Sequence, residues 1–293
     1  MTCSVLAVLE IRRILFPVDF SEQTDITSPF VNALASHFGA QVTLLRVVPP
    51  PQGLSSESGE LALFDPGTLL HDVEPHLDGA IHREFAGLHV ERVLEFGDPA
   101  EMIARFAYTQ GADLIMMPTH GCGPLRHLLL GSVTAKVVHD APCPVWTSVH
   151  AEEFRPSANT TWHTVLCAVD QTESTPAIKW ASQFAEKVGA TLQLVHVIPW
   201  SEHWWQTQPS LDWQSKLQQE ALQHIERLQR HAGVKAQTTV KTGPIARGVC
   251  DEARKQQADL LVIGRGLARD TAGRFGKHGY EILRIAPCPV ISV

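Results

Sequence analysis

The chain has 293 residues, a formal net charge of −7, and a composition of 44% hydrophobic and 19% charged residues. This length suits two ordinary domains, and this composition is typical of a globular protein with a sizeable core. The acidic balance and the lack of a Lys/Arg cluster argue against nucleic-acid binding. Without a signal sequence or an apolar run of membrane-spanning length, we expect a cytoplasmic protein with no membrane partner.

Strands and helices are predicted to alternate through the first half, from the periodicity of its apolar residues. The expected strands are 14–18, 41–48, 90–96, 114–117 and 145–149, and the expected helices are 30–38, 69–86, 99–110 and 133–138. Pro29 is predicted either to open the helix that follows it or to kink that helix.

The second half is predicted to repeat this alternation. Its expected strands are 165–169, 191–198, 236–241, 260–263 and 290–293, and its expected helices are 178–188, 211–231, 245–256 and 280–285. Strands that alternate with helices favour right-handed βαβ crossovers and a parallel sheet covered on both faces. The expected fold class is therefore α/β, with doubly wound, Rossmann-like sheets.

An internal repeat supports two homologous domains. The sequence Ala-Pro-Cys-Pro-Val at 141–145 recurs at 286–290, Ala-Asp-Leu at 112–114 recurs at 258–260, and Val-Asp at 18–19 recurs at 169–170. The stretch between the copies is polar and contains proline, which suits an exposed connector. We expect a first domain at 1–150, a linker at 151–163 and a second domain at 164–293.

The segment 112–149 carries the strongest functional signal. Its apolar strand ends at Pro118, a loop with Gly121 follows, and Gly131-Ser132 stands immediately before a helical pattern. Ser132 is expected to cap that helix, whose first backbone N–H groups are unpaired and attract anions. Glycines let a backbone approach a phosphate closely, although the same residues also occur in a simple turn.

This segment resembles the nucleotide loop of the universal stress protein family, whose pattern is Gly-x2-Gly-x9-Gly-Ser/Thr. Nine residues separate Gly121 from Gly131, and Ser132 follows, but Pro118 stands at the first glycine of the pattern. Because proline has no backbone N–H, one contact to a ligand is in doubt there.

The resemblance implies an adenine nucleotide alpha hydrolase-like fold and an ATP site in the first domain, with Mg²⁺ held through the phosphates. It implies that Asp19 faces the adenine, although spacing alone favours Asp19 as a helix cap. It also implies that the backbone of Val47 contacts the base. The residues expected at this site are Pro17, Val18, Asp19, Val47, Pro118, His120, Gly121, Gly131, Ser132, Val133 and Thr134.

The second half departs from the family pattern. Asp170 and Val197 are kept, but six residues instead of seven separate its aspartate, Asp259, from the glycine at 266. Lys277 stands where the first half has Ser132. Lys277 could hold a phosphate as a point charge, but a degenerate loop is the favoured interpretation. We therefore expect about one ATP per chain, bound in the first domain.

Catalytic and metal sites are not expected. No nucleophile elbow, no paired carboxylates and no Walker loop occur, and His71, His76, His82 and His89 lack the spacing of metal ligands. The six cysteines stand singly and are expected to be reduced. The favoured function is thus a stress-response regulator that binds ATP with little or no hydrolysis. The alternative is an adaptor that binds no nucleotide and acts on an unknown protein partner through its surface.

Assembly follows from the same resemblance, because single-domain family members pair as dimers through their last strands. The last strands here, at 145–149 and 290–293, are short and apolar. We expect the two domains to form a pseudo-dimer within the chain through these strands, since a sheet edge exposes unpaired backbone groups. A homodimer of the whole chain stays open.

Overall fold

The computed structural model describes residues 9–50, 67, 71, 85–119, 130–148, 161–170, 174–199, 211–265 and 277–293, without the side chains of 211–214 and 277. The chain divides into two compact units: Ile11–Thr160 forms one, and Thr161–Val293, grouped with the residues before Ile11, forms the other. Most of the helix predicted at 69–86 lies outside the described residues: His71 is helical, and Phe85 and Ala86 lie in a turn. His76, His82, His120 and Gly121 also lie outside the described residues.

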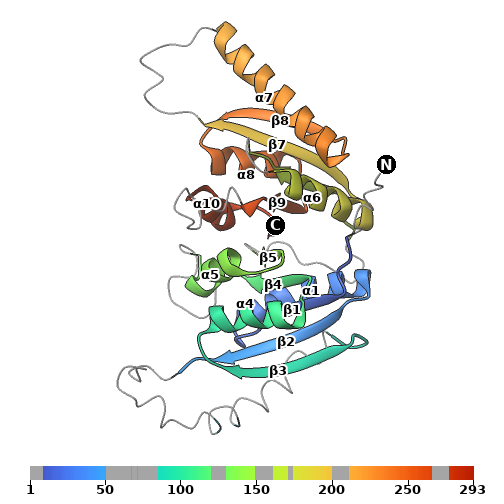
Figure 1. Ribbon diagram of the computed structural model, residues 1–293, viewed down its shortest axis with the longest axis vertical. Helices are drawn as coiled ribbons and strands as arrows, with labels where there is room; N and C mark the ends of the chain where they lie inside the picture. The colour runs from blue at the N-terminus through green and yellow to red at the C-terminus, as the bar shows by residue number, and fades with distance from the viewer. Residues whose placement is uncertain are drawn as a thin grey trace. The chain divides into compact units, whose positions relative to one another are not determined.

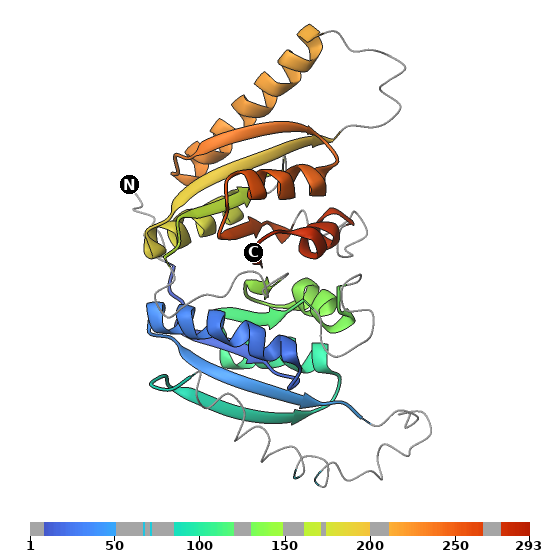
Figure 2. The same ribbon diagram turned by 180° about the vertical axis from the view of Figure 1, so that it is seen from behind.

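The first unit is a five-stranded parallel sheet in the order β3-β2-β1-β4-β5. Figures 1 and 2 show α1 on one face of this sheet and α4 and α5 on the other. Its elements are β1 (Arg13–Pro17), α1 (Glu22–Phe38), β2 (Gln41–Val48), β3 (Val90–Phe96), α4 (Pro99–Gln110), β4 (Leu114–Pro118), α5 (Ser132–Asp140) and β5 (Val145–Ser148).

The second unit repeats this sheet in the order β8-β7-β6-β9-β10. Helices α6 and α7 cover one face, and α8 and α10 cover the other (Figures 1 and 2). Its elements are β6 (Thr164–Ala168), α6 (Thr175–Val188), β7 (Thr191–Pro199), α7 (Leu211–Ala232), β8 (Gln237–Gly243), α8 (Ile245–Lys255), β9 (Leu260–Ile263), α10 (Lys277–Ile285) and β10 (Val290–Ser292).

The central strands are buried on both faces, as expected for a doubly wound sheet. All five residues of β4 and all four of β9 are buried. Such strands need helices on each side, because an exposed face would leave apolar surface in water. The α/β fold class and the two-domain arrangement predicted from the repeat are confirmed.

The same aspartate clamp fastens the start of the central strand in each unit. Asp113 Oδ2 accepts hydrogen bonds from the backbone N–H groups of Arg12 and Arg13, at 2.8 and 2.9 Å. Asp259 Oδ2 accepts from His163 and Thr164, at 2.7 and 2.9 Å. The Ala-Asp-Leu repeat therefore marks a structural contact.

Helix α1 begins eight residues earlier than expected, so the prediction of a helix over 30–38 was too short. Pro29 lies inside α1 and does not open it. The first turns of α1 contain few apolar residues, so the periodicity of apolar residues does not predict them as helical. Their polar side chains are satisfied locally, since the Thr27 and Ser28 hydroxyls donate to the carbonyls four residues earlier at 2.8 Å.

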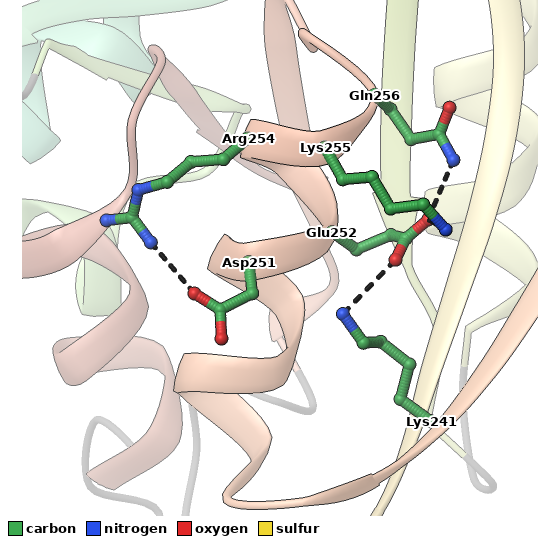
Figure 3. A network of polar contacts seen from close by, with 6 residues as sticks. All are labelled: Lys241, Asp251, Glu252, Arg254, Lys255 and Gln256. Atoms are coloured by element: carbon green, nitrogen blue, oxygen red, sulfur yellow. Dashed lines mark hydrogen bonds and ion pairs between the residues drawn. The ribbon is translucent and has the colours of Figure 1, made fainter.

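A buried carboxylate distinguishes the second unit. Glu252 of α8 is 1% exposed; Lys241 Nζ of β8 lies 3.2 Å from its Oε2, and Gln256 donates to its Oε1 at 2.7 Å (Figure 3). Burial favours the neutral form of this carboxyl, but the contacts from Gln256 and Lys241 outweigh burial and hold the pKa of Glu252 below its ordinary value. This network joins α8 to the edge strand β8.

No helix among the described residues is long and apolar enough to cross a membrane.

Candidate functional site

A cleft of about 390 Å³ opens at the carboxyl ends of the central strands of the first unit. Strand β1 lies between β2 and β4, so the chain winds in opposite directions on its two sides. Ligands of open α/β sheets bind at such a switch point. The cleft is lined by Pro17, Val18, Asp19, Leu45, Arg46, Val47, Pro49, Pro99, Ile103, Met117, Pro118, Gly131, Ser132, Val133 and Thr134.

Nine of the eleven residues expected at a nucleotide site line this one cleft. They come from the ends of β1, β2 and β4 and from the start of α5. The other two, His120 and Gly121, lie outside the described residues. The fold therefore brings segments that are distant in the sequence to one cleft.

The start of α5 differs from expectation by one residue. Gly131 is the N-cap and Ser132 is the first helical residue, so the prediction that Ser132 caps the helix was wrong. The physical reason is that the Gly131 carbonyl already accepts the first helical hydrogen bond, from Ala135 at 2.9 Å. Ser132 is exposed on the first turn, where its hydroxyl and the leading N–H groups are close together.

Two hydrogen bonds fix this helix start against the end of β4. The Thr134 hydroxyl donates to the Pro118 carbonyl at 3.1 Å, and the Gly131 N–H donates to the Thr119 carbonyl at 2.9 Å. Thr134 is buried, so its hydroxyl serves the fold rather than the open cleft. The N-terminal end of α5 is consequently held at the cleft before any ligand arrives.

Asp19 takes part in the turn that leads into α1. Its Oδ1 accepts from the Ser21 N–H at 3.0 Å, from the Ser21 hydroxyl at 2.5 Å and from the Thr24 hydroxyl at 2.9 Å. The N-cap of α1 is Ser21, and Asp19 accepts from no backbone N–H of the helix, so the helix-cap interpretation that spacing favoured was wrong; these contacts close the turn before the helix instead. They orient the carboxylate, and no described residue donates to its second oxygen.

The sequence argument missed Arg46, which supplies a cation to the cleft wall. Its guanidinium lies 5.2 Å from the centre of the Phe20 ring, and its Nη1 donates to the Val18 carbonyl at 3.4 Å. A charged residue within the apolar strand β2 was the signal that could have revealed it. Arg46 and Asp19 give the cleft lining one charge of each sign.

Helices α4 and α5, whose first residues line the cleft, are joined by an exposed ion pair. Lys136 Nζ lies 3.1 Å from Asp98 Oδ1, and both side chains are about half exposed. The backbone N–H of Glu101 and then Lys136 hold the pKa of Asp98 below its ordinary value. Such exposed pairs contribute little stability, so this contact links the N-cap of α4 to α5 without adding much to the free energy of unfolding.

Comparison with known proteins identifies the repeated unit. The model of the universal stress protein family matches residues 10–148 and, a second time, residues 161–293. The chain belongs to the universal stress protein family. The two matches confirm the predicted tandem member.

Several known proteins resemble the chain over one domain or over both. A universal stress protein of Methanocaldococcus jannaschii is 29% identical over 150 residues, which cover 46% of this chain and 92% of that protein. A solved universal stress protein of Archaeoglobus fulgidus is 21% identical, with a TM-score of 0.66 over 96% of this chain and 97% of that one. The protein PA1789 of Pseudomonas aeruginosa is 19% identical, with a TM-score of 0.64 over 98% of this chain and 93% of that one. At these identities, the structural likeness concerns the fold.

The second universal stress domain has a smaller cleft, of about 190 Å³, at the equivalent edge of its sheet. It is lined by Ala168, Val169, Asp170, His196, Val197, Pro199, Ile245 and Val249. The aspartate contact is repeated there, since the Ser174 hydroxyl donates to Asp170 Oδ1 at 2.9 Å. Helix α10 begins at Lys277, the residue expected in place of Ser132.

Proposed function

We propose that the first domain binds an adenine nucleotide, ATP, and that the chain is a stress-response regulator with little or no hydrolysis. The observation that carries this proposal is the start of α5 at Gly131-Ser132, which opens on the same cleft as Asp19. A phosphate chain suits a helix N-terminus, and an aspartate suits the donor edge of a base.

The size and lining of the cleft support a ligand of this class. Its volume of about 390 Å³ lies within the range of small-molecule sites. Apolar walls from Val18, Val47, Ile103 and Met117 suit a planar base, while Ser132 and the first N–H groups of α5 offer polar groups at the other end. When Mg²⁺ accompanies the nucleotide, it would be held through the phosphates.

Binding is proposed to be asymmetric, with about one ATP per chain. The first cleft includes a helix start with a hydroxyl, Ser132, whereas no residue of α10 is among the described residues that line the second cleft. Loss of the hydroxyl at Lys277 and the shortened loop before Gly266 support a second domain that holds no phosphate chain.

Calorimetry with ATP and Mg²⁺ on the full chain tests the proposal, with Gly131→Val as the blocking variant. A valine side chain at this position should obstruct approach of the phosphates and weaken binding by about tenfold or more. The φ of Gly131 is −57°, which every residue adopts, so the variant should fold. Gly264→Ala in the second domain is the control, because its added Cβ meets only an ordinary contact, 3.5 Å from Ala177.

Unchanged ATP affinity in Gly131→Val would show that the site lies elsewhere. A stoichiometry near two, or loss of ATP on changing Asp170 but not Asp19, would make Lys277 a phosphate ligand. If the wild-type chain binds no nucleotide, the adaptor function is the alternative. Turnover of ATP with Mg²⁺ would instead indicate an enzyme.

We also propose that the domains pair within the chain through their last strands, β5 and β10. The basis is the sequence. Both strands are short and apolar, and each is the last strand of its sheet, where unpaired backbone groups are available for pairing. Hydrogen exchange compares the amides of 145–148 in the full chain and in the separate first half. Equal protection in both would contradict pairing.

A further inference from the structure

The two domains have equivalent edge strands, β3 and β8. Among the described residues, β3 pairs only with β2, and β8 pairs only with β7. Val47 lies opposite Glu95, and its equivalent Val197 lies opposite Lys241, so the two edges can be compared residue by residue. No residue of either strand is buried. An edge strand presents unpaired N–H and C=O groups with which another strand can pair.

The two edges differ in charge. Strand β3 contains three charged residues, Glu91, Arg92 and Glu95, whereas β8 contains only Lys241. The ammonium group of Lys241 lies 3.2 Å from Oε2 of the buried Glu252, so this charge is directed toward α8 (Figure 3). Charged side chains are a common means by which proteins prevent edge strands from pairing. Strand β3 has this protection, and β8 has little of it.

Helix α7 extends past β8. Figures 1 and 2 show its N-terminal half, residues 211–220, continuing beyond this edge of the sheet; we call this half the overhang. The C-terminal half is fastened to β8, because Gln229 Nε2 donates to the Thr238 hydroxyl at 3.0 Å. In the overhang, by contrast, the side chains of 215–220 are exposed, apart from the half-buried Leu217. Ten helical residues rise about 15 Å, and an added strand would lie only about 4.8 Å from β8.

We infer that β8 is a docking edge for a second copy of this chain, which adds its own β8 in antiparallel orientation. Strand β8 has seven residues, and Val240 is the middle one. A twofold axis at Val240 places Thr238 opposite the partner's Thr242, and Thr239 opposite the partner's Lys241. Threonine pairs across strands are favourable, and this arrangement places no like charges opposite each other.

The same operation on β3 is unfavourable. A twofold axis at its middle residue, Val93, places Glu91 opposite the partner's Glu95. Like charges directly opposite each other destabilise an antiparallel pair. Self-pairing is therefore expected at β8 and not at β3, and it does not depend on nucleotide binding.

The overhang suits the same partner. A twofold axis perpendicular to the sheet puts both copies of α7 on one face of the joined sheet, with antiparallel overhangs. Leu222, which follows the overhang, is 38% exposed and offers an apolar contact. Within the overhang, Lys216 and Glu220 have opposite charges, so antiparallel helices can bring Lys216 toward the partner's Glu220.

Analytical ultracentrifugation of the full chain, at low and at high micromolar concentration, tests whether copies associate. Hydrogen exchange under the same conditions locates the contact. The amides of 237–243 should exchange more slowly at the higher concentration, because pairing protects them, whereas those of 90–96 should not change.

Thr239→Lys places a lysine opposite the partner's Lys241 and should raise the dimer dissociation constant about tenfold or more. Thr239→Glu places the opposite charge there and should keep the dimer. The matched control is Val93→Lys, at the equivalent position of β3, which should leave the dissociation constant unchanged. Thermal unfolding of each variant checks that it folds.

A chain that stays monomeric at high micromolar concentration would overturn the inference. A dimer whose amides at 237–243 exchange at the same rate at both concentrations would also overturn it, since the copies then meet elsewhere. If Thr239→Lys folds and dimerises as the wild type does, or if Val93→Lys disrupts the dimer to the same extent, β8 is not the docking edge.

Discussion

Single residues at equivalent positions show how the two domains diverged. Glu252 of α8 stands where α4 has Phe106, and its partner Lys241 stands where β3 has Glu95. The buried charged pair of the second domain thus replaces a phenylalanine and a glutamate of the first. Because buried pairs are weak evidence for net stability, the two solutions need not differ in free energy.

The charged pair predicts a specific response to substitution. Lys241→Met leaves the buried carboxylate with only the exposed Lys255, 3.9 Å from its Oε1, as a cation, and we expect a loss of about 1.5–3 kcal/mol in the free energy of unfolding. Adding Glu252→Leu should recover much of this loss, because an apolar pair removes the unpaired charge. Urea unfolding of both variants measures the effect, and a double variant that is less stable than Lys241→Met would contradict it.

The same carboxylate predicts a pH dependence. The pKa of Glu252 is lower in the folded protein than in the unfolded chain, so its charge stabilises the fold above the unfolded value of about 4.3. This contribution disappears as pH falls through the lowered folded pKa. Glu252→Gln should therefore reduce the loss of stability between about pH 5 and pH 3, measured by unfolding at each pH. If the free energy of unfolding of Glu252→Gln falls as steeply with decreasing pH as that of the wild type, Glu252 does not contribute to the acid sensitivity.

Two buried cysteines should be chemically inert. Burial raises the pKa of Cys167 and that of Cys250 to about 12, and the thiolate is the reactive form. In the native protein at pH 8, iodoacetamide should leave both unmodified, whereas both should react after denaturation. Peptide mapping by mass spectrometry gives the result, and rapid native labelling of Cys167 would show that its strand opens readily.

At the scale of the elements, periodicity predicted every strand and most helices to within a few residues. It failed where polar side chains bond to their own helix, as Thr27 and Ser28 do in α1. It also missed Arg46. A pattern of apolar residues predicts the strand but does not predict that the side chain of one charged residue in it lines the cleft. The cap of α5 depended on one backbone hydrogen bond, which the sequence does not display.

Close packing of α8 on β7 depends on Gly248. A Cβ built there would lie 2.9 Å from Val197 Cγ2, closer than side chains pack. Gly248→Ala should gain helix propensity but lose about 1–3 kcal/mol through overpacking. Val197→Ala in the same chain should relieve the clash and restore part of the stability, as thermal unfolding would reveal. Stabilisation by Gly248→Ala alone would show that the helix shifts without cost.

At the scale of the whole molecule, the proposed single ATP site predicts ligand effects that are confined to the first domain. If ATP binds the first domain, hydrogen exchange should slow in 17–19, 45–49 and 131–134 and stay unchanged in 168–170 and 196–199. A ligand at about one hundred times its dissociation constant adds about 2.7 kcal/mol to the domain that binds it. Slowing in both sets would instead indicate two nucleotide sites.

Because Asp113 and Asp259 make equivalent hydrogen bonds, the exchange rate of an amide in one domain can be compared with that of its equivalent in the other. The amides of Arg13 and Thr164 donate to them at the same distance, 2.9 Å, in every copy of the chain. Both amides are labelled in the same sample. Errors in temperature, pH and labelling time therefore largely cancel in the ratio of their exchange rates. A drug, a mutation or a change of buffer that moves this ratio has acted unequally on the two halves.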